Sequence, residues 1–335
     1  MQTLKRLFIF FLGFIFIAVL AAGWLYHYYH LKMVLPVVPY EFSIESGSNL
    51  KQITHQLAND NILPDTWSFI LLSYLLNKES ALKAGDYRLT RNVSQIALLD
   101  YLVKGDVHQN EVRFVEGWTF SQFREALYDH PDIQKTTAKM SEQEILQQVG
   151  ALESSAEGLF FPDTYYFIKN STDIEILQRA YQTMQNHVQN AWTERIKSLP
   201  LESPYEALIL ASIVEKETGI DSDRSEIAGV FINRLRMGMP LQTDPTVIYG
   251  LGDTFDGNLR KKDLQADQDY NTYMRVGLPP TPIAMPGLAS IHAAVKPAKT
   301  DSLYFVAKGN GESVFSTNLK DHNRAVTKYQ KQQKK

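Results

Sequence analysis

The chain has 335 residues, of which 44% are apolar and 21% charged, and its formal net charge is −3. This length predicts two or three domains, and the apolar content excludes wholesale disorder. The charge balance leaves no basic surplus for a nucleic-acid partner, and the lack of cysteine excludes disulfides, thiolate nucleophiles and zinc–thiolate sites.

The first segment of the chain is strongly apolar. Lys5 and Arg6 precede the uncharged run Leu7–Leu25, and several aromatic residues follow it. At ~1.5 Å per residue this run makes a helix of about 28 Å, close to the ~30 Å hydrocarbon core of a bilayer. Residues 7–25 are therefore a predicted transmembrane helix, with the aromatic residues at the membrane interface.

The charges around this run predict its orientation. Two basic residues precede it and Lys32 alone follows it, so residues 1–6 are predicted to be cytoplasmic. Residues 26–39, which contain two prolines, are a predicted linker. The protein is therefore expected to cross the inner membrane once, with the rest of the chain in the periplasm. A cleaved signal peptide is the alternative interpretation, because residues 19–22 include small side chains.

Residues 40–106 are predicted to form a small domain. Tyr40–Ile44 alternates like a half-buried strand, apolar residues then recur at helical spacing from Leu50 and again from Phe69, and Gly85–Leu89 is a closing strand. This βααβ order resembles the LysM module, which binds N-acetylglucosamine-rich glycans in other proteins. A spacer domain without a ligand remains an open alternative.

Residues 107–200 are predicted to be a connecting region of mixed α/β structure. A strand-like stretch, Glu111–Val115, is followed by helical patterns. Within the region, Glu157–Phe167 is dense in aromatic residues. Such a segment is typical of a packed structural loop, although sugar-binding sites also favour aromatic faces.

The stretch from Ser203 to Gly219 predicts a helix with well-marked ends. Ser203 and Glu206 have the spacing of a capping box, Pro204 suits the first helical position, and Gly219 suits a stop. The helix is apolar almost all round, which predicts burial.

One face of this helix also carries a carboxyl group. The apolar residues of that face are Ile209, Leu210, Ile213 and Val214. At 100° per residue Glu217 falls on the same face, whereas Glu215 points the opposite way. Burial and the negative end of the helix dipole would raise the pKa of Glu217, as a general acid requires. Helical geometry alone leaves open that Glu217 reaches solvent or pairs with a cation such as Arg224.

The same segment carries a family resemblance. Ala211–Thr218, with the sequence ASIVEKET, resembles the signature of the endolytic murein transglycosylases, the MltG or YceG-like family. The resemblance continues in order through Val230–Leu235, Leu241–Gly250, Tyr270–Tyr273, Gly277–Pro280, Pro286–Gly287 and Tyr304–Ala307. It spans nearly the whole chain and implies an α+β fold, with residues 201–335 as the catalytic domain and Glu217 as the catalytic residue.

The resemblance also implies a reaction. Glu217 would protonate the oxygen between N-acetylmuramic acid and N-acetylglucosamine, and would then accept the proton of the muramic acid C6 hydroxyl as that oxygen attacks C1. The product is a 1,6-anhydro end, formed without water or a cofactor. Peptidoglycan strands are the implied substrate, termination of nascent strands the implied role, and glycan polymerases such as penicillin-binding proteins the implied partners.

Further site residues are predicted from polar groups in loop-like motifs. Gln242, Asp244, Tyr270 and Asn271 could line a glycan cleft, although Asp244 also suits a turn and Tyr270 could simply pack. No metal site is predicted, because the histidines show no ligand spacing beyond a pair at the membrane boundary. Two alternatives stay open: a hydrolase in which Asp244 activates water, and a non-catalytic scaffold that binds peptidoglycan.

Overall fold

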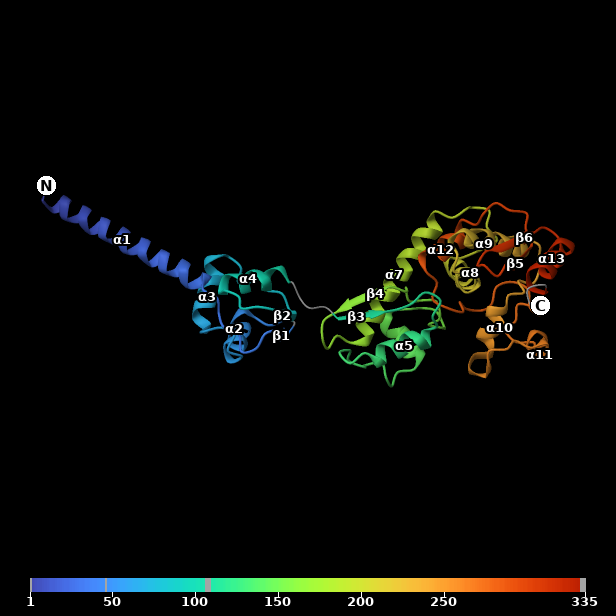
Figure 1. The fold of residues 1–335 in the computed structure, drawn as a ribbon, viewed down its shortest axis with the longest axis horizontal. Coiled ribbons are helices and arrows are strands. Elements are labelled where there is room, and N and C mark those ends of the chain that lie inside the picture. The colour runs from blue at the N-terminus through green and yellow to red at the C-terminus, as the bar shows by residue number, and fades with distance from the viewer. Residues whose placement is uncertain (1, 46, 106–109, 332–335) are drawn as a thin grey trace. The chain divides into compact units, whose positions relative to one another are not determined.

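The structure is a computed structural model that describes residues 2–45, 47–105 and 110–331, with side chains from residue 10 to residue 330. The chain forms two compact units. Unit 1 comprises Met1–Asn110 with Phe167–Lys169, and unit 2 comprises Glu111–Tyr166 with Asn170–Lys335. Their mixed helices and strands confirm the α+β class (Figure 1). The predicted boundary at residue 200 falls inside unit 2, and the one at 106 lies outside the described residues.

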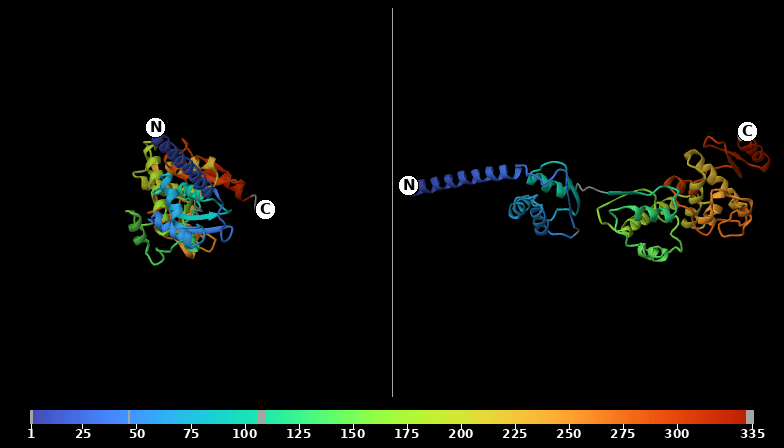
Figure 2. Two further views of the ribbon diagram at one scale, coloured as in Figure 1. Left: turned by 90° about the vertical axis from the view of Figure 1, so that its left-hand side faces the viewer. Right: turned by 60° about the horizontal axis from the view of Figure 1, so that its bottom comes forward.

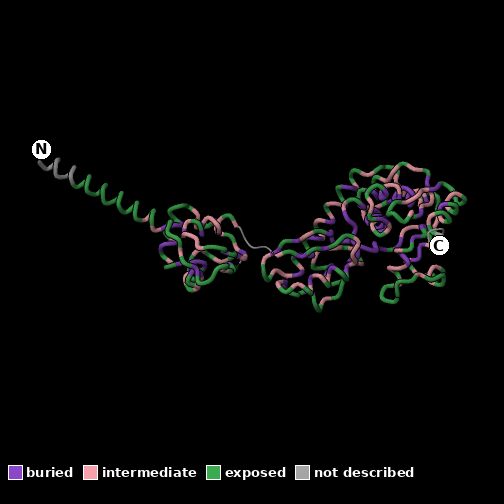
Figure 3. Tube along the Cα trace, viewed as in Figure 1, coloured by how far each residue is buried: buried purple, intermediate pink, exposed green. Residues whose placement is uncertain are grey.

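Unit 1 begins with one long helix, α1, from Gln2 to His30. Its part Phe10–His30 is long and apolar enough to cross a membrane by length and composition, and it is exposed over most of its described length (Figure 3). The helix continues through residues 26–30, which were predicted to be linker, because no proline or glycine interrupts it there. The side chains of Lys5 and Arg6, on which the predicted orientation depends, lie outside the described residues.

The rest of unit 1 is a small α+β domain. Its elements in order are β1 (Tyr40–Ile44), α2 (Leu50–Asn59), α3 (Thr66–Leu75), β2 (Gly85–Leu89) and α4 (Gln95–Lys104). The two strands pair antiparallel, with Tyr40 opposite Leu89. The predicted βααβ order is therefore present, followed by α4, which packs on α1 and α3. Its core includes Leu57, Phe69 and Tyr87.

From residue 110 onward the chain is mainly helical. The elements are β3 (Asn110–Arg113), α5 (Phe120–Asp129), α6 (Glu142–Val149), β4 (Thr164–Phe167), α7 (Asp173–Thr193), α8 (Pro204–Glu217), α9 (Asp221–Arg236), α10 (Asp244–Leu251), η1 (Gly252–Thr254), α11 (Lys261–Gln265), α12 (Leu288–Val295), β5 (Tyr304–Ala307), β6 (Ser313–Ser316), α13 (Leu319–Val326) and η2 (Thr327–Lys331). Strand β3 pairs with β4 and β5 with β6. Helix α8 packs against α7, α9, α10 and α12 (Figures 1 and 2).

The ends of α8 follow largely from local side chains. Ser203 Oγ accepts a hydrogen bond from the Glu206 N–H at 3.2 Å, and Pro204 occupies the first turn. The predicted capping box does not close, because the Glu206 carboxylate accepts from the Glu202 N–H at 2.7 Å instead. The helix ends at Glu217, with Thr218 as its C-cap. Residues 207–214 are all buried, as the apolar pattern predicted.

Candidate active site

Glu217 is the last residue of α8, and its carboxyl group is enclosed although the residue as a whole is only partly buried. Thr243 Oγ1 donates a hydrogen bond to Glu217 Oε1. Burial raises the pKa of Glu217 to about 7. The Thr243 hydroxyl and the charge of Arg234 oppose this shift, and the negative charge of Asp244 adds to it. The direction is the one that the helix predicted, and it leaves both protonation states accessible near neutral pH.

Glu215, two residues earlier, is also enclosed, contrary to the prediction that it points away from the interior. Only 7% of its side chain is exposed. Its Oε2 accepts a hydrogen bond from the Gly287 N–H at 2.9 Å, and its Oε1 lies 3.9 Å from Arg224 Nη2. Arg224 also pairs with Asp221. The cation considered as a partner of Glu217 is therefore shared by Asp221 and Glu215.

The loop that carries Thr243 is fixed from two sides. Arg234 on α9 is buried, and its guanidinium donates to the carbonyl oxygens of Pro240 (3.2 Å) and Leu241 (2.8 Å). On the other side, the Thr243 N–H donates to Thr272 Oγ1 at 3.1 Å. These contacts hold the Thr243 hydroxyl against Glu217.

Two of the predicted site residues flank Thr243. Gln242 is exposed and has a left-handed backbone with φ of +52°, and its N–H donates to the Thr272 carbonyl at 3.0 Å. Asp244 is exposed at the start of α10, and its Oδ1 accepts from the Tyr273 hydroxyl at 2.6 Å. Both side chains are therefore accessible beside the enclosed carboxyl of Glu217.

The other two predicted site residues, Tyr270 and Asn271, differ in their exposure. Tyr270 lines a cavity, and its hydroxyl lies 2.8 Å from Thr281 Oγ1. Asn271 is fully buried, and its amide donates to the carbonyl oxygens of Asp263, Leu264 and Ala266. Contrary to the prediction, Asn271 has no exposed atoms to offer a glycan in this structure, because its hydrogen bonds are used to hold the loop.

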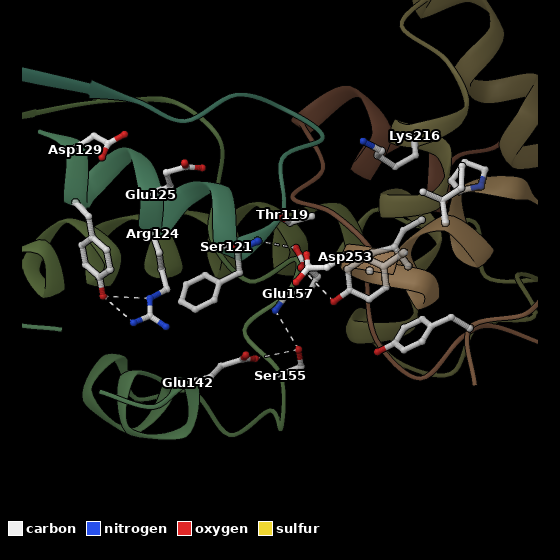
Figure 4. Close-up of a pocket in the computed structure, with 18 residues that line it drawn as sticks. Thr119, Ser121, Arg124, Glu125, Asp129, Glu142, Ser155, Glu157, Lys216 and Asp253 are labelled. Atoms are coloured by element: carbon white, nitrogen blue, oxygen red, sulfur yellow. Dashed lines mark hydrogen bonds between the residues drawn. The ribbon is translucent and has the colours of Figure 1, made fainter. Parts of the chain in front are cut away.

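The cavity has a volume of about 1180 Å³ and lies within unit 2 (Figure 4). It is bounded by α5, by the segment around Glu157 and by α10 and Tyr270. Its wall also includes Lys216 and Pro245, the chain neighbours of Glu217 and Asp244. Glu217, Gln242 and Asp244 are not themselves among the residues that line it. The volume is in a range suited to a ligand larger than one sugar ring.

Glu157 on the cavity wall was not singled out by the sequence. It is 5% exposed, and its carboxylate accepts hydrogen bonds from the Phe120 N–H at 3.1 Å and from the Tyr249 hydroxyl at 3.2 Å. Burial raises the pKa of Glu157 to about 7, against the effect of these two donors. The Tyr249 ring in turn packs edge-on against Tyr270, with ring centroids 4.9 Å apart. The one signal in the sequence was an ionisable residue at the start of an aromatic segment.

Among the residues that the structure describes, no group of three or more acidic or histidine side chains is placed to hold a metal ion. The residues around Glu217 and along the cavity include hydroxyl, carboxyl and aromatic groups together with the cations Arg124, Lys216 and Arg234. Groups of these kinds bind sugars, and a carboxyl whose pKa is raised to about 7 is suited to proton transfer.

Comparisons with known proteins all point to the same family. The model of the YceG-like family matches residues 42–328. The chain is 34% identical over 306 residues to a Bacillus subtilis protein named endolytic murein transglycosylase, covering 86% of this chain and 84% of that protein. It is 31% identical over 356 residues to a Streptococcus pneumoniae protein of the same name, covering 94% of this chain and 64% of the relative.

A solved structure is similar as well. The crystal structure of a putative YceG-like protein from Listeria monocytogenes superposes with a TM-score of 0.55 at 28% sequence identity, covering 85% of this chain and 98% of that one. Sequence and fold thus agree over most of the chain, including the segment that carries Glu217. The chain belongs to the YceG-like family.

Proposed function

We propose that the protein is an endolytic lytic transglycosylase of peptidoglycan, with Glu217 as its acid and base. The names of relatives that are 34% and 31% identical support the reaction and the substrate. The observation that carries the assignment of Glu217 is its carboxyl, which accepts a hydrogen bond from the Thr243 hydroxyl and whose pKa burial raises to about 7.

One carboxyl group suffices for this reaction. Protonated Glu217 gives its proton to the oxygen that leaves as the glycan bond to C1 breaks. The resulting carboxylate then takes the proton of the muramic acid C6 hydroxyl while O6 bonds to C1, so Glu217 ends as it began. A pKa near the working pH suits a group that must act in both directions. The tethered nucleophile also avoids the entropic cost of capturing a water.

The surroundings of Glu217 support both halves of the cycle. The Thr243 hydroxyl donates to the carboxyl oxygen, which stabilises the carboxylate after the first proton transfer. The charge of Asp244 acts in the opposite direction and favours the protonated acid. Gln242 and Asp244, which are exposed, and Tyr270, which is partly buried on the cavity wall, are proposed contacts for the glycan.

A water-using muramidase is the second candidate, and Asp244 is the observation that favours it. Its carboxylate is exposed, held by the Tyr273 hydroxyl, and close enough to Glu217 to affect the pKa of that group. In an inverting hydrolase a second carboxylate of this kind activates water. The two candidates give different products, since a hydrolase leaves a reducing end and a transglycosylase an anhydro end.

We further infer that α1 anchors the protein in the inner membrane, with its N-terminus in the cytoplasm and the chain after α1 in the periplasm. The length and composition of Phe10–His30 support the span, and the flanking charges of the sequence support the orientation. Glycan binding by the LysM-like part of unit 1, termination of nascent strands and contact with glycan polymerases are proposed from the family resemblance alone.

The deciding experiment is digestion of purified peptidoglycan by the detergent-solubilised full chain, with product ends identified by mass spectrometry. We expect anhydro ends from the natural protein and a loss of about 10²-fold or more in rate for Glu217→Gln. Glu206→Gln is the matched control, because it makes the same change at the partly buried start of the same helix and its amide oxygen can still accept from the Glu202 N–H.

Each alternative has its own outcome. Equal fragments from the natural protein and Glu217→Gln would show that another group is the acid. Reducing ends would identify a hydrolase. If neither protein cuts while both bind glycan strands equally, the protein is a scaffold.

A further inference from the structure

Helix α3 in unit 1 is apolar on both its buried and its exposed side. Its sequence, TWSFILLSYL, contains no charged residue. Phe69 and Leu72 are buried in the core of unit 1. The opposite side, which we call the α3 outer face, consists of Trp67, Leu71, Tyr74 and Leu75, which are 58%, 39%, 59% and 60% exposed. A helix on a water-facing surface normally carries polar or charged residues there, so this face needs an apolar neighbour.

The first turn of α3 is bonded directly to the end of α1. The Tyr28 hydroxyl donates to Asp65 Oδ2 at 3.0 Å, and Asp65 is the N-cap of α3. The Tyr29 hydroxyl, in a residue that is only 5% exposed, donates to the Ser68 carbonyl at 3.2 Å. Both helices belong to the same compact unit, and α3 lies beside the end of α1 in Figure 1. The position of α3 is therefore tied to the point where the candidate membrane span ends.

The segment after α1 extends this apolar surface. Leu31 and Val34 are 51% and 80% exposed. They line a small cleft of about 300 Å³ together with Asn61 and Pro64, just before α3 begins. Exposed apolar side chains thus continue from the end of the span to the segment that enters α3.

We propose that the α3 outer face lies in the headgroup region of the bilayer and holds unit 1 against the membrane surface. This proposal rests on the proposed anchor. Trp and Tyr are the residues that favour the membrane interface, because each combines a large apolar ring with a polar group. Because α3 is bonded to the end of the candidate span, its exposed apolar side lies close to where the bilayer surface would be.

The lack of cysteine makes the test direct. Single variants Trp67→Cys, Leu71→Cys and Tyr74→Cys of the full chain are labelled with a nitroxide and placed in nanodiscs of phosphatidylcholine and phosphatidylglycerol. Collisions with oxygen and with a water-soluble nickel complex then report depth. Ile17→Cys, in the middle of α1, tests whether α1 lies in the bilayer. Lys51→Cys, at an exposed position of α2, gives the accessibility of a label in water.

The expected result is an oxygen-to-nickel accessibility ratio at residues 67, 71 and 74 that is at least about threefold above that at residue 51 and approaches that at residue 17. A label at Leu75→Cys should lose this protection when Leu71→Glu and Tyr74→Glu are added. These two exposed positions can accept charge without disturbing the core.

Three outcomes would overturn the proposal, and they differ from one another. A water-exposed label at residue 17 shows that the anchor itself is wrong. A lipid-embedded residue 17 with α3 labels as exposed as residue 51 leaves the anchor in place and removes the α3 contact. Protection of the α3 labels from both oxygen and nickel indicates a protein neighbour, either a second copy or a partner, instead of lipid.

Discussion

Two carboxyl groups on α8 lie two residues apart and have different surroundings. Glu215 accepts a hydrogen bond from the Gly287 N–H, and Arg224 Nη2 lies 3.9 Å from it. Glu217 receives its hydrogen bond from the uncharged Thr243 hydroxyl instead. Burial of Glu217 favours its protonated form and outweighs the opposing effects of the Thr243 hydroxyl and of the Arg234 charge. The two carboxyl groups therefore differ in the partners that the tertiary structure gives them.

The Thr243 hydroxyl gives a test at the residue scale. Because the pKa of Glu217 is raised to about 7, its protonated fraction, and with it the rate of strand cleavage, should fall as pH rises through about 7. Thr243→Val removes a donor to the carboxylate, so the alkaline limb of kcat/KM should move upward by roughly one pH unit. Thr243→Ser keeps the hydroxyl donor and should leave the pH dependence of kcat/KM unchanged. An alkaline limb that stays in place in the valine variant would contradict the proposed role of the hydroxyl.

At the scale of elements, the site depends on loops that are held by buried polar side chains. Helix α8 is fixed by its apolar contacts, but the loops after α9 and after α11 have few regular hydrogen bonds of their own. Arg234 holds the first through the Pro240 and Leu241 carbonyls, and Asn271 holds the second. The two loops meet where the Thr243 N–H donates to Thr272.

Asn271→Ala should therefore act on stability. Loss of the Asn271 amide leaves three carbonyl oxygens without their donor. We therefore expect a decrease of about 2 kcal/mol in the free energy of unfolding of unit 2, measured by urea titration. Tyr270→Phe is the control from the same loop. It removes one hydroxyl and should cost less than about 1 kcal/mol. A variant Asn271→Ala with natural stability and a raised KM would instead show that Asn271 contacts the glycan.

At the scale of the whole molecule, Glu157 and Glu217 in unit 2 are enclosed carboxyl groups with raised pKa values. Burial raises the pKa of both Glu157 and Glu217 from the ordinary 4.5 to about 7. Each group therefore favours the folded state fully below pH 4.5, and this contribution is lost as pH rises to about 7. Keeping these two carboxyl groups buried therefore lowers the free energy of unfolding at neutral and alkaline pH.

Glu157→Gln should remove the part of this pH dependence that comes from Glu157. We expect the variant to be more stable than the natural protein at pH 8, by on the order of 2 kcal/mol, and to differ little from it below pH 4.5. Because the chain has two units, unfolding should be followed in unit 2 alone, by hydrogen exchange of the α8 and α12 amides in urea. A stability difference that does not change with pH would contradict the raised pKa of Glu157.

The sequence by itself determined the features that depend on neighbouring residues. The apolar run after Lys5 and Arg6 predicted a helix, and the spacing in Ser203–Gly219 predicted the burial and the ends of α8 to within two residues. Helical periodicity and capping are local, since each residue acts on positions three or four away. The same local geometry placed Glu217 on a buried face, and the motif order indicated the family that the comparisons later established.

The tertiary structure alone decided the hydrogen-bond partner of each polar side chain at the site. Glu157 meets Phe120 and Tyr249, which are 37 and 92 positions away, and Glu217 meets Thr243 across 26 positions. No periodic pattern encodes such contacts, so the sequence missed Glu157 and expected Asn271 to face a ligand. Protonation at the site is set by desolvation and by hydrogen-bond partners, and both exist only once distant segments have packed together.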